Sequence, residues 1–515
     1  MTLTKRSCFG VLAFFALAYA TPGGNAGNDP VPDQDKQRLT AGKELFTREW
    51  LQGDKRSYAG DGLGPVFNAR SCLACHNQGG VGGAGGKQAN ATLVSAFVTR
   101  DPIHRGMLVS AETRPKGILA TFFPSIAQNL DSVKPLKQPD RAKLAEIHPA
   151  LRTANSFPLH RFGVDKEFTN WRLDLFGDPL GDSDLETGIF SFLNESPNVP
   201  GFPHTKKVGD ATVELVLSER NTPALFGVGL IDQILDRVLE EVAAEQAKAA
   251  KARPLDKPSS PDSLMKGQAA LPLAGRAARL KDGRIGRFGW KANVATLREF
   301  TLQACSNEIG LEVPGFPRAV PAWKKNYKAP GLDLSAEQCD QLIHFVAFLL
   351  PPASRPPETP QHATEIAAGK KHFGEIGCAT CHRPKLGNVD GIYSDLLLHD
   401  MGQLLSDDGA YGTSIQGVAS GDMLPLPTRS ENTPPEAREK LPKFGAGSRE
   451  WRTPPLWGLR DSAPYLHDGR ANTVADAVAN HGGEGLPAAE AFFALSQRER
   501  QQVELFLQSL AAPAN

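Results

Sequence analysis

The chain has 515 residues, of which 40% are hydrophobic, so it can bury large cores and is expected to form two to four units. Its 57 Lys and Arg residues balance its 57 Asp and Glu residues, which gives a formal net charge of zero at pH 7. This balance excludes the basic surface of a nucleic-acid-binding protein, and we expect no nucleic acid partner.

Residues 1–20 have the organisation of a secretory signal peptide. A short basic start at Lys5 and Arg6 precedes an apolar run over 9–17, and small residues follow at 18 and 20. The apolar run is too short to span a bilayer, and no later run of eighteen apolar residues follows it. We therefore expect a periplasmic protein without a transmembrane segment.

Two Cys-x-x-Cys-His sequences, at 72–76 and 378–382, carry the strongest chemical signal. This spacing is the attachment signature of a c-type haem, in which two thiolates bond to the porphyrin and the histidine ligates iron. On a helical turn the three side chains share one face. A zinc site would need a compact four-ligand cluster, and a redox disulfide would need a βαβ context; neither pattern is present.

The sequence therefore predicts two covalently bound haem c groups, each with its iron. The predicted attachment residues and proximal ligands are Cys72, Cys75 and His76 for the first haem, and Cys378, Cys381 and His382 for the second.

The chain repeats itself around these motifs. The sequence Gly-Lys-x-x-Phe occurs at 42–46 and again at 369–373, each time opening a helix that leads to a Cys pair. A mainly α fold with two tandem cytochrome c-like domains explains the repetition. We expect an N-terminal domain over 36–350 and a C-terminal domain over 362–515.

Composition and apolar periodicity predict the structure of other segments of the chain. The proline-rich stretch 351–361 is expected to be a stiff linker. The first domain is about twice as long as the second, so it should carry a long mixed insertion at about 90–215. Apolar periodicity predicts helices over 231–251 and 489–510. The glycines at 79–86 follow a haem motif and not a strand, which argues against a nucleotide-binding loop.

Two cysteines remain once the leader and the haem motifs are set aside. Cys305 and Cys339 are an even pair in an oxidising compartment, which allows a disulfide, but two buried thiols are equally compatible with the sequence.

Four further motifs resemble the bacterial di-haem cytochrome c peroxidase superfamily, most closely its branch of di-haem oxidoreductases, often labelled thiol oxidoreductases. They lie at 67–71, 286–292, 393–402 and 463–470. The resemblance covers nearly all of the chain after the leader. It implies a C-terminal haem that receives electrons and an N-terminal haem that binds peroxide.

The resemblance also implies two catalytic residues. Glu308, in Asn-Glu-Ile-Gly at 307–310, matches the carboxylate that acts as general acid and base on peroxide. Trp290 matches the tryptophan that relays electrons between the haems. Trp171 is a weaker candidate for the same relay.

The sixth iron ligands are less well defined. Met401 lies in a segment that resembles a haem-proximal one, so it is the expected ligand of the C-terminal haem, with Met423 second. Leu466 stands where the family often has Met or Phe. For the N-terminal haem the alternatives are histidines that the sequence does not separate: His104, His148, His160 and His204.

Taken with the resemblance, the sequence predicts an exported di-haem oxidoreductase that reduces hydrogen peroxide. A small periplasmic donor, a cytochrome c or a cupredoxin, would deliver electrons to the C-terminal haem. Two alternatives stay open: a di-haem electron-transfer protein without peroxidase activity, and a di-haem oxygenase or protein-modifying oxidant.

Overall fold

The computed structural model describes residues 33–99, 138–176, 204–252, 270–324, 326–352, 356–407, 409 and 442–513. Helical residues outnumber strand residues within these ranges, in agreement with the predicted mainly α class. The predicted signal peptide at 1–20 lies outside the described residues. None of the described helices has the length and apolar character needed to cross a membrane.

The first Cys motif begins in a helix and the second in a short helical turn. The α-helices are α1 Asp33–Thr47, α2 Cys72–Cys75, α5 Arg141–Ile147, α6 Lys166–Phe176, α8 Val228–Asp232, α9 Asp236–Ala252, α10 Leu297–Ala304, α11 Ala336–Ala347, α12 Pro360–Glu375, α13 Val474–Ala479, α14 Leu486–Ala494 and α15 Gln497–Gln508. Short 3-10 or π turns are η1 Lys87–Ala89, η3 Pro149–Arg152, η4 Cys305–Ile309, η5 Cys378–Thr380, η6 Gln403–Leu405 and η7 Leu459–Asp461.

The strands form one four-stranded sheet and several two-stranded ladders. They are β1 Val66–Phe67, β2 Ala91–Thr99, β3 Ser156–Leu159, β4 Phe162–Gly163, β5 His204–Val208, β6 Ala211–Arg220, β7 Ala278–Arg279, β8 Ile285–Gly286, β9 Lys385–Leu386, β10 Val389–Asp390, β11 Leu398–Asp400 and β12 Glu450–Arg452. The ladders pair β1 with β4, β7 with β8, β9 with β10, and β11 with β12, all antiparallel.

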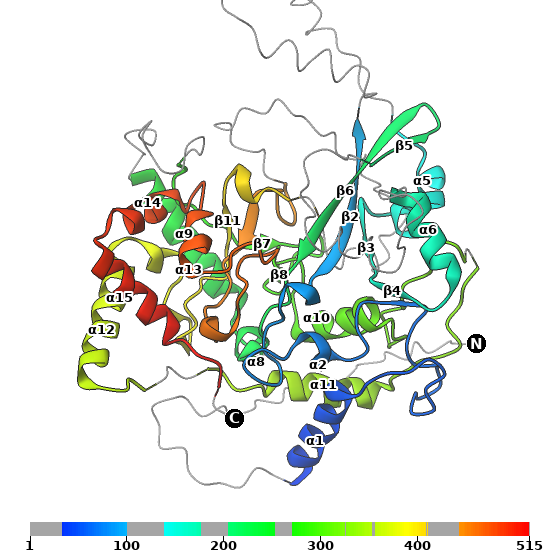
Figure 1. Ribbon diagram of the computed structural model, residues 1–515, viewed down its shortest axis with the longest axis horizontal. Coiled ribbons are helices and arrows are strands. Elements are labelled where there is room, and N and C mark those ends of the chain that lie inside the picture. The colour runs from blue at the N-terminus through cyan, green and yellow to red at the C-terminus, as the bar shows by residue number, and fades with distance from the viewer. Residues whose placement is uncertain are drawn as a thin grey trace, which may run out of the picture.

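The same helix pairing occurs beside each Cys motif. α1 packs on α11, and α12 packs on α15 (Figure 1). A Cβ at Gly42 would overlap the carbonyl oxygen of Gln341, and a Cβ at Gly369 would overlap that of Gln502. The glycines therefore let the helix backbones come into contact. The sequence repeat thus has a structural counterpart, although the division into two tandem domains stays a prediction.

The segment predicted as a mixed insertion contains the four-stranded antiparallel sheet. Its strand order is β3-β2-β6-β5, and the β2–β6 ladder runs from the Ala91–Arg220 pair to the Thr99–Thr212 pair. A separate core that includes Val94, Phe157 and Leu215 lies against α5 and η3. In the view of Figure 1 the sheet lies on the side opposite α12 and α15, with α2, α8 and α10 between them.

Two expected helices differ from the structure because each is interrupted. The tail predicted as one helix over 489–510 forms α14 and α15, since Ser496 and Glu499 make a capping box that starts a new helix. The helix predicted over 231–251 is divided between α8 and α9, which are separated at 233–235. Of the predicted linker at 351–361, the last two residues already belong to α12, which begins with Pro360.

Candidate haem sites

The first Cys-x-x-Cys-His sequence forms a helical turn in the wall of a cavity. α2 begins after Ser71, whose hydroxyl oxygen accepts a hydrogen bond from the Ala74 backbone N–H at 3.1 Å. The turn places Cys72, Cys75 and His76 along one cavity, which we call the N-terminal cavity. The three predicted attachment residues therefore face a common space.

The glycines after this motif orient the His76 ring. Nδ1 of His76 lies 3.2 Å from the carbonyl oxygen of Gly83, and the backbone N–H of Gly82 donates to the His76 carbonyl at 3.0 Å. Burial lowers the pKa of His76 to about 4, so the ring is neutral at pH 7. With Nδ1–H bonded to a carbonyl, Nε2 keeps its lone pair for a metal. The glycine cluster thus packs on the histidine, as a haem motif requires.

The second motif repeats this geometry. Cys378, Cys381 and His382 line another cavity, the C-terminal cavity. Nδ1 of His382 lies 3.0 Å from the carbonyl oxygen of Tyr393, and the pKa of His382 is lowered to about 4, mainly by burial. Its Nε2 is therefore also available to a metal.

A phenylalanine from the preceding helix contacts each motif histidine in the same way. The ring centroids of Phe46 and His76 are 6.2 Å apart, with an interplanar angle of 48°. Those of Phe373 and His382 are 6.4 Å apart, with an angle of 50°. These phenylalanines end the repeated Gly-Lys-x-x-Phe sequence, so the repeat preserves a contact that orients the imidazole.

The residues around the second motif fit a porphyrin, which presents an apolar ring and anionic propionates. The guanidinium of Arg452 lines the C-terminal cavity and donates to the carbonyl oxygens of Gly289 at 2.8 Å and Thr453 at 3.4 Å. Within the described residues no carboxylate pairs with it, and burial lowers its pKa to about 10. A buried cation of this kind is stabilised when a ligand supplies the anion. Arg452 is therefore the residue that would hold a propionate.

Glu308 lies in the N-terminal cavity, together with Cys75 and His76. It belongs to the π-helical turn η4, a rare element that is frequent at functional sites. Its Oε2 accepts a hydrogen bond from the Asn68 side-chain amide at 2.6 Å, and its carbonyl accepts one from the Asn68 backbone N–H at 2.7 Å. The predicted acid–base residue thus shares a cavity with the first motif and is fixed by the Asn68 segment.

Trp290 lies between the two sites. It lines both the N-terminal and the C-terminal cavity. Its Nε1–H donates to the carbonyl oxygen of Asn221 at 2.8 Å, which fixes the indole plane. The backbone N–H of Arg452 donates to the Trp290 carbonyl at 2.9 Å. Trp290 is therefore a wall residue of both cavities, and its role as an electron relay stays a prediction.

Comparison with known proteins agrees with this arrangement. The family model described as "Di-haem oxidoreductase, putative peroxidase" matches residues 212–417 and 437–510, more than half of the chain. The chain belongs to this family. The match includes the second Cys motif, Trp290 and Glu308, whereas the first Cys motif lies outside it.

Relatives outside the family model are more distant. The methylamine utilization protein MauG of Methylorubrum extorquens is 28% identical over 145 residues, which are 27% of this di-haem oxidoreductase and 32% of MauG. The comparison thus spans about a third of that relative. A hydrazine synthase of Kuenenia stuttgartiensis has 15% identity and a TM-score of 0.29, and covers 77% of this chain and 100% of its own. A MauG-like protein associated with microbial copper homeostasis has 15% identity and a TM-score of 0.25, over 54% of this chain and 90% of its own.

Two side chains in the C-terminal cavity could complete the coordination of an iron held by His382. Met401, the residue predicted from the sequence, lines this cavity. His481, which sequence reasoning missed, lines it too, and its Nδ1 lies 2.7 Å from the Ala477 carbonyl oxygen. This is the same imidazole-to-carbonyl bond that His76 and His382 make. Burial lowers the pKa of His481, so its Nε2 is available as well.

His399, two residues before Met401, lies between two carboxylates. Its Nε2 is 3.0 Å from Asp395 and its Nδ1 is 2.8 Å from Glu484, while the Cys381 sulfur is 3.7 Å away. Both ring nitrogens are therefore occupied by hydrogen bonds. His399 is fixed in the wall of the cavity and is a poor candidate for the iron ligand.

The N-terminal cavity differs from the C-terminal one. Among the described residues that line it, His76 is the sole histidine and there is no methionine. Of the four histidines considered from the sequence, His148 stacks on Phe157 at 4.1 Å, and His160 bonds the Asn307 carbonyl at 2.9 Å. Neither lines this cavity. His104 and the side chain of His204 lie outside the described residues, as do Met107, Met265 and Met423.

The remaining candidates lie away from the cavities. Trp171 packs against Trp323 at 5.8 Å beside the sheet, and it lines neither cavity. Cys305 and Cys339 are free and buried, and burial raises the pKa of both thiols. The structure thus has two buried thiols at these positions and not a disulfide.

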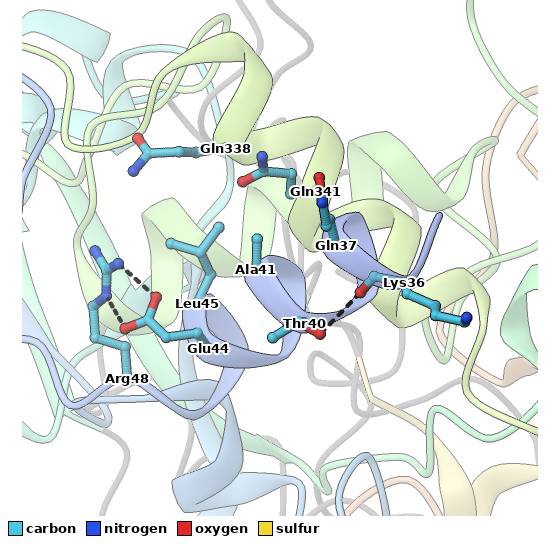
Figure 2. Close-up of a pocket in the computed structure, with 9 residues that line it drawn as sticks. All are labelled: Lys36, Gln37, Thr40, Ala41, Glu44, Leu45, Arg48, Gln338 and Gln341. Atoms are coloured by element: carbon cyan, nitrogen blue, oxygen red, sulfur yellow. Dashed lines mark hydrogen bonds and ion pairs between the residues drawn. The ribbon is translucent and has the colours of Figure 1, made fainter. Parts of the chain in front are cut away.

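A groove on the outer side of α1 and α11 has a different character (Figure 2). Its wall includes Glu44 and Arg48, whose side chains form a two-point ion pair at 2.9 and 2.6 Å. The groove contains none of the predicted site residues. The predicted haem-attachment and catalytic residues line the N-terminal and C-terminal cavities and not this groove.

Proposed function

We propose that this di-haem oxidoreductase is a periplasmic c-type haem protein that reduces hydrogen peroxide, with electrons entering through the C-terminal haem. The observation that supports this proposal best is the asymmetry of the two cavities. The N-terminal cavity combines His76 with the carboxylate of Glu308, whereas the C-terminal cavity combines His382 with His481 and Met401. One site suits a small substrate, and the other suits a six-coordinate electron-transfer centre.

When bound, the haems supply the iron that activates peroxide and stores electrons, held by thioether bonds to the four motif cysteines. Glu308 contributes the proton chemistry. Its carboxylate accepts a proton from the oxygen of hydrogen peroxide that binds and returns it to the oxygen that departs as water. The Asn68 amide, 2.6 Å from Oε2, holds the carboxylate in one orientation during this transfer.

Electron delivery begins at the C-terminal cavity. We propose that a small periplasmic donor, a cytochrome c or a cupredoxin, reduces the C-terminal haem. Trp290 then carries electrons towards the N-terminal site, because its indole lines both cavities. The reduction of one peroxide consumes two electrons and two protons and yields two waters.

We propose His481 as the sixth ligand of the C-terminal haem. The hydrogen bond from Nδ1 to the Ala477 carbonyl fixes its tautomer in the way expected of a metal-bound histidine. His382 and His481 both line the C-terminal cavity. Met401, the ligand predicted from the sequence, is the competing candidate.

The decisive experiment compares oxidised and half-reduced protein by optical and EPR spectroscopy and then adds hydrogen peroxide. We expect two covalent haems per chain, a low-spin C-terminal haem, and a high-spin signal that peroxide removes after half-reduction. If half-reduced protein has two low-spin haems and does not consume peroxide, the electron-transfer alternative replaces this proposal. Consumption of peroxide coupled to oxidation of a partner protein would instead favour the oxygenase or protein-modifying alternative.

A further inference from the structure

A second tryptophan near the cavities, Trp451, is enclosed on both faces of its ring. It lines the C-terminal cavity and is 6% exposed. The His467 ring stacks on it at a centroid distance of 3.6 Å and an angle of 15°. The Lys291 ammonium nitrogen lies 3.7 Å from the Trp451 centroid. Two groups this close to one ring cannot share a face, so the imidazole and the ammonium cover opposite faces.

The ammonium group of Lys291 is held in this position by the backbone. It donates to the carbonyl oxygens of Gly447 at 2.9 Å, Ser448 at 2.7 Å and Glu450 at 2.9 Å. The guanidinium of Arg220 also lies 5.1 Å from the Trp451 centroid, but it is paired with the Asp407 carboxylate through bonds of 2.8 and 2.7 Å. The positive charge that backbone carbonyls fix beside this ring is therefore that of Lys291.

Trp290 differs from Trp451 in the contacts of its ring. Its ring lines both cavities, and among the described residues no cation lies over it. One-electron oxidation makes an indole positively charged. A fixed ammonium group repels that charge and attracts the neutral ring, so it disfavours oxidation. The two tryptophans therefore differ in how easily they lose an electron.

We infer that Lys291 keeps Trp451 reduced and thereby directs electron transfer between the haems through Trp290. The inference rests on the proposed peroxide reduction, which supplies the oxidant. Each peroxide accepts two electrons and two protons and gives two waters. For each electron that passes, Trp290 loses one electron towards the N-terminal site and regains one from the C-terminal haem. Trp451 loses none. Lys291 acts as a positioning residue for charge, although it also lines the N-terminal cavity.

The test compares Lys291→Gln, which replaces the ammonium with an uncharged N–H donor, with Lys291→Arg, which keeps the charge. Half-reduced proteins are mixed with excess hydrogen peroxide without an electron donor. Oxidised tryptophan is then located by peptide mass spectrometry, and radicals are counted by freeze-quench EPR. Both variants are first checked for two haems per chain. Since both variants replace the same side chain and differ in its charge, the comparison tests the charge.

We expect oxidation in the wild type mainly at Trp290, with only a low level at Trp451. Lys291→Gln should raise oxidation of Trp451 at least tenfold, and Lys291→Arg should leave it at the wild-type level. Equal oxidation of Trp451 in the Gln and Arg variants would overturn the inference. If the Gln variant does not assemble, the wild type alone provides the test. An EPR radical on Trp451 that is as abundant as the radical on Trp290 would then overturn the inference.

Failure of the proposed function is a separate outcome. If the wild type does not react with peroxide, that function is wrong, and the same three proteins are treated with hexachloroiridate(IV), a one-electron oxidant. If Trp451 is oxidised tenfold more in Lys291→Gln than in Lys291→Arg, the role of Lys291 is supported. Equal oxidation of Trp451 in the two variants refutes it.

Discussion

Substitution of Glu308 by Gln separates the assembly of the N-terminal site from its chemistry. Gln has nearly the same volume as Glu, and its carbonyl oxygen can still accept the hydrogen bond that Asn68 donates at 2.6 Å. The turn η4 and the backbone bonds from the Asn68 segment are retained. The amide, however, cannot take up and return a proton at pH 7. The variant should therefore bind both haems and accept electrons but reduce peroxide slowly.

The expected magnitudes follow from the role of each residue. Loss of a positioned acid–base group costs about 10²- to 10⁴-fold in rate, or about 2.7–5.5 kcal/mol of barrier. Asn68→Leu leaves the carboxylate but removes a hydrogen bond to a charged group, worth about 1.5–3 kcal/mol, which corresponds to roughly 10- to 150-fold. The order of rates should be wild type, then Asn68→Leu, then Glu308→Gln.

The assay is stopped-flow peroxide reduction by half-reduced protein with a haem count for every variant. Glu337→Gln, the same chemical change on the exposed face of α11, is the matched control and should react like the wild type. A Glu308→Gln variant that retains both haems and reduces peroxide at the wild-type rate would refute the assignment of Glu308. A loss of haem in that variant would show a structural role instead.

Three further predictions concern ligation, packing and attachment. His481→Ala should convert the C-terminal haem from low spin to high spin by EPR, whereas Met401→Leu should leave it low spin; the reverse result would return the ligand role to Met401. Gly369→Ala forces a Cβ into the α15 backbone and should lower the thermal midpoint by the equivalent of about 1–3 kcal/mol, while Gly374→Ala, where nothing lies within 4 Å, should not. Cys381→Ala should reduce the mass of the denatured protein by one covalent haem relative to the other variants, and an unchanged mass would contradict haem attachment at the second motif.

Local features of the sequence were sufficient to predict the helical turn of the first Cys motif and the helix that precedes each motif. The Cys-x-x-Cys-His spacing follows from the geometry of one helical turn, so its structure is fixed by nearby residues. The Gly-Lys-x-x-Phe repeat predicted two equivalent helices, and the structure has them in α1 and α12, each with its phenylalanine on the motif histidine. In these cases the interacting atoms belong to one short segment or to a repeated one.

Helix boundaries were less predictable because the competing signals are small. The tail has apolar residues at helical spacing across Leu495 and Ser496, which favours one helix. The Ser496 hydroxyl and the Glu499 carboxylate nevertheless cap a new one. A cap of this kind contributes about 1 kcal/mol, comparable with the cost of breaking the helix, so periodicity alone could not decide.

The partners of the site residues could not be read from the sequence at all. Asn68 and Glu308 are joined by a hydrogen bond although 240 positions separate them. His481 is marked as a ligand candidate only by the bond from its ring to the Ala477 carbonyl and by the cavity that it lines. In the sequence it is one of 12 histidines. Such contacts depend on how distant segments pack, which no local pattern records.

The segments that are repeated at both Cys motifs and the segments that occur once contribute different walls of the two cavities. A glycine-mediated helix contact, a phenylalanine and a carbonyl-bonded histidine recur at both motifs, so the proximal sides of the two haem sites are alike. Other walls of the two cavities come from segments that are not repeated: η4 brings a carboxylate to the first cavity, and the turn after α13 brings an imidazole to the second. Because an imidazole closes a coordination position and a carboxylate can serve an open one, we propose that these two segments set the different roles of the two haems.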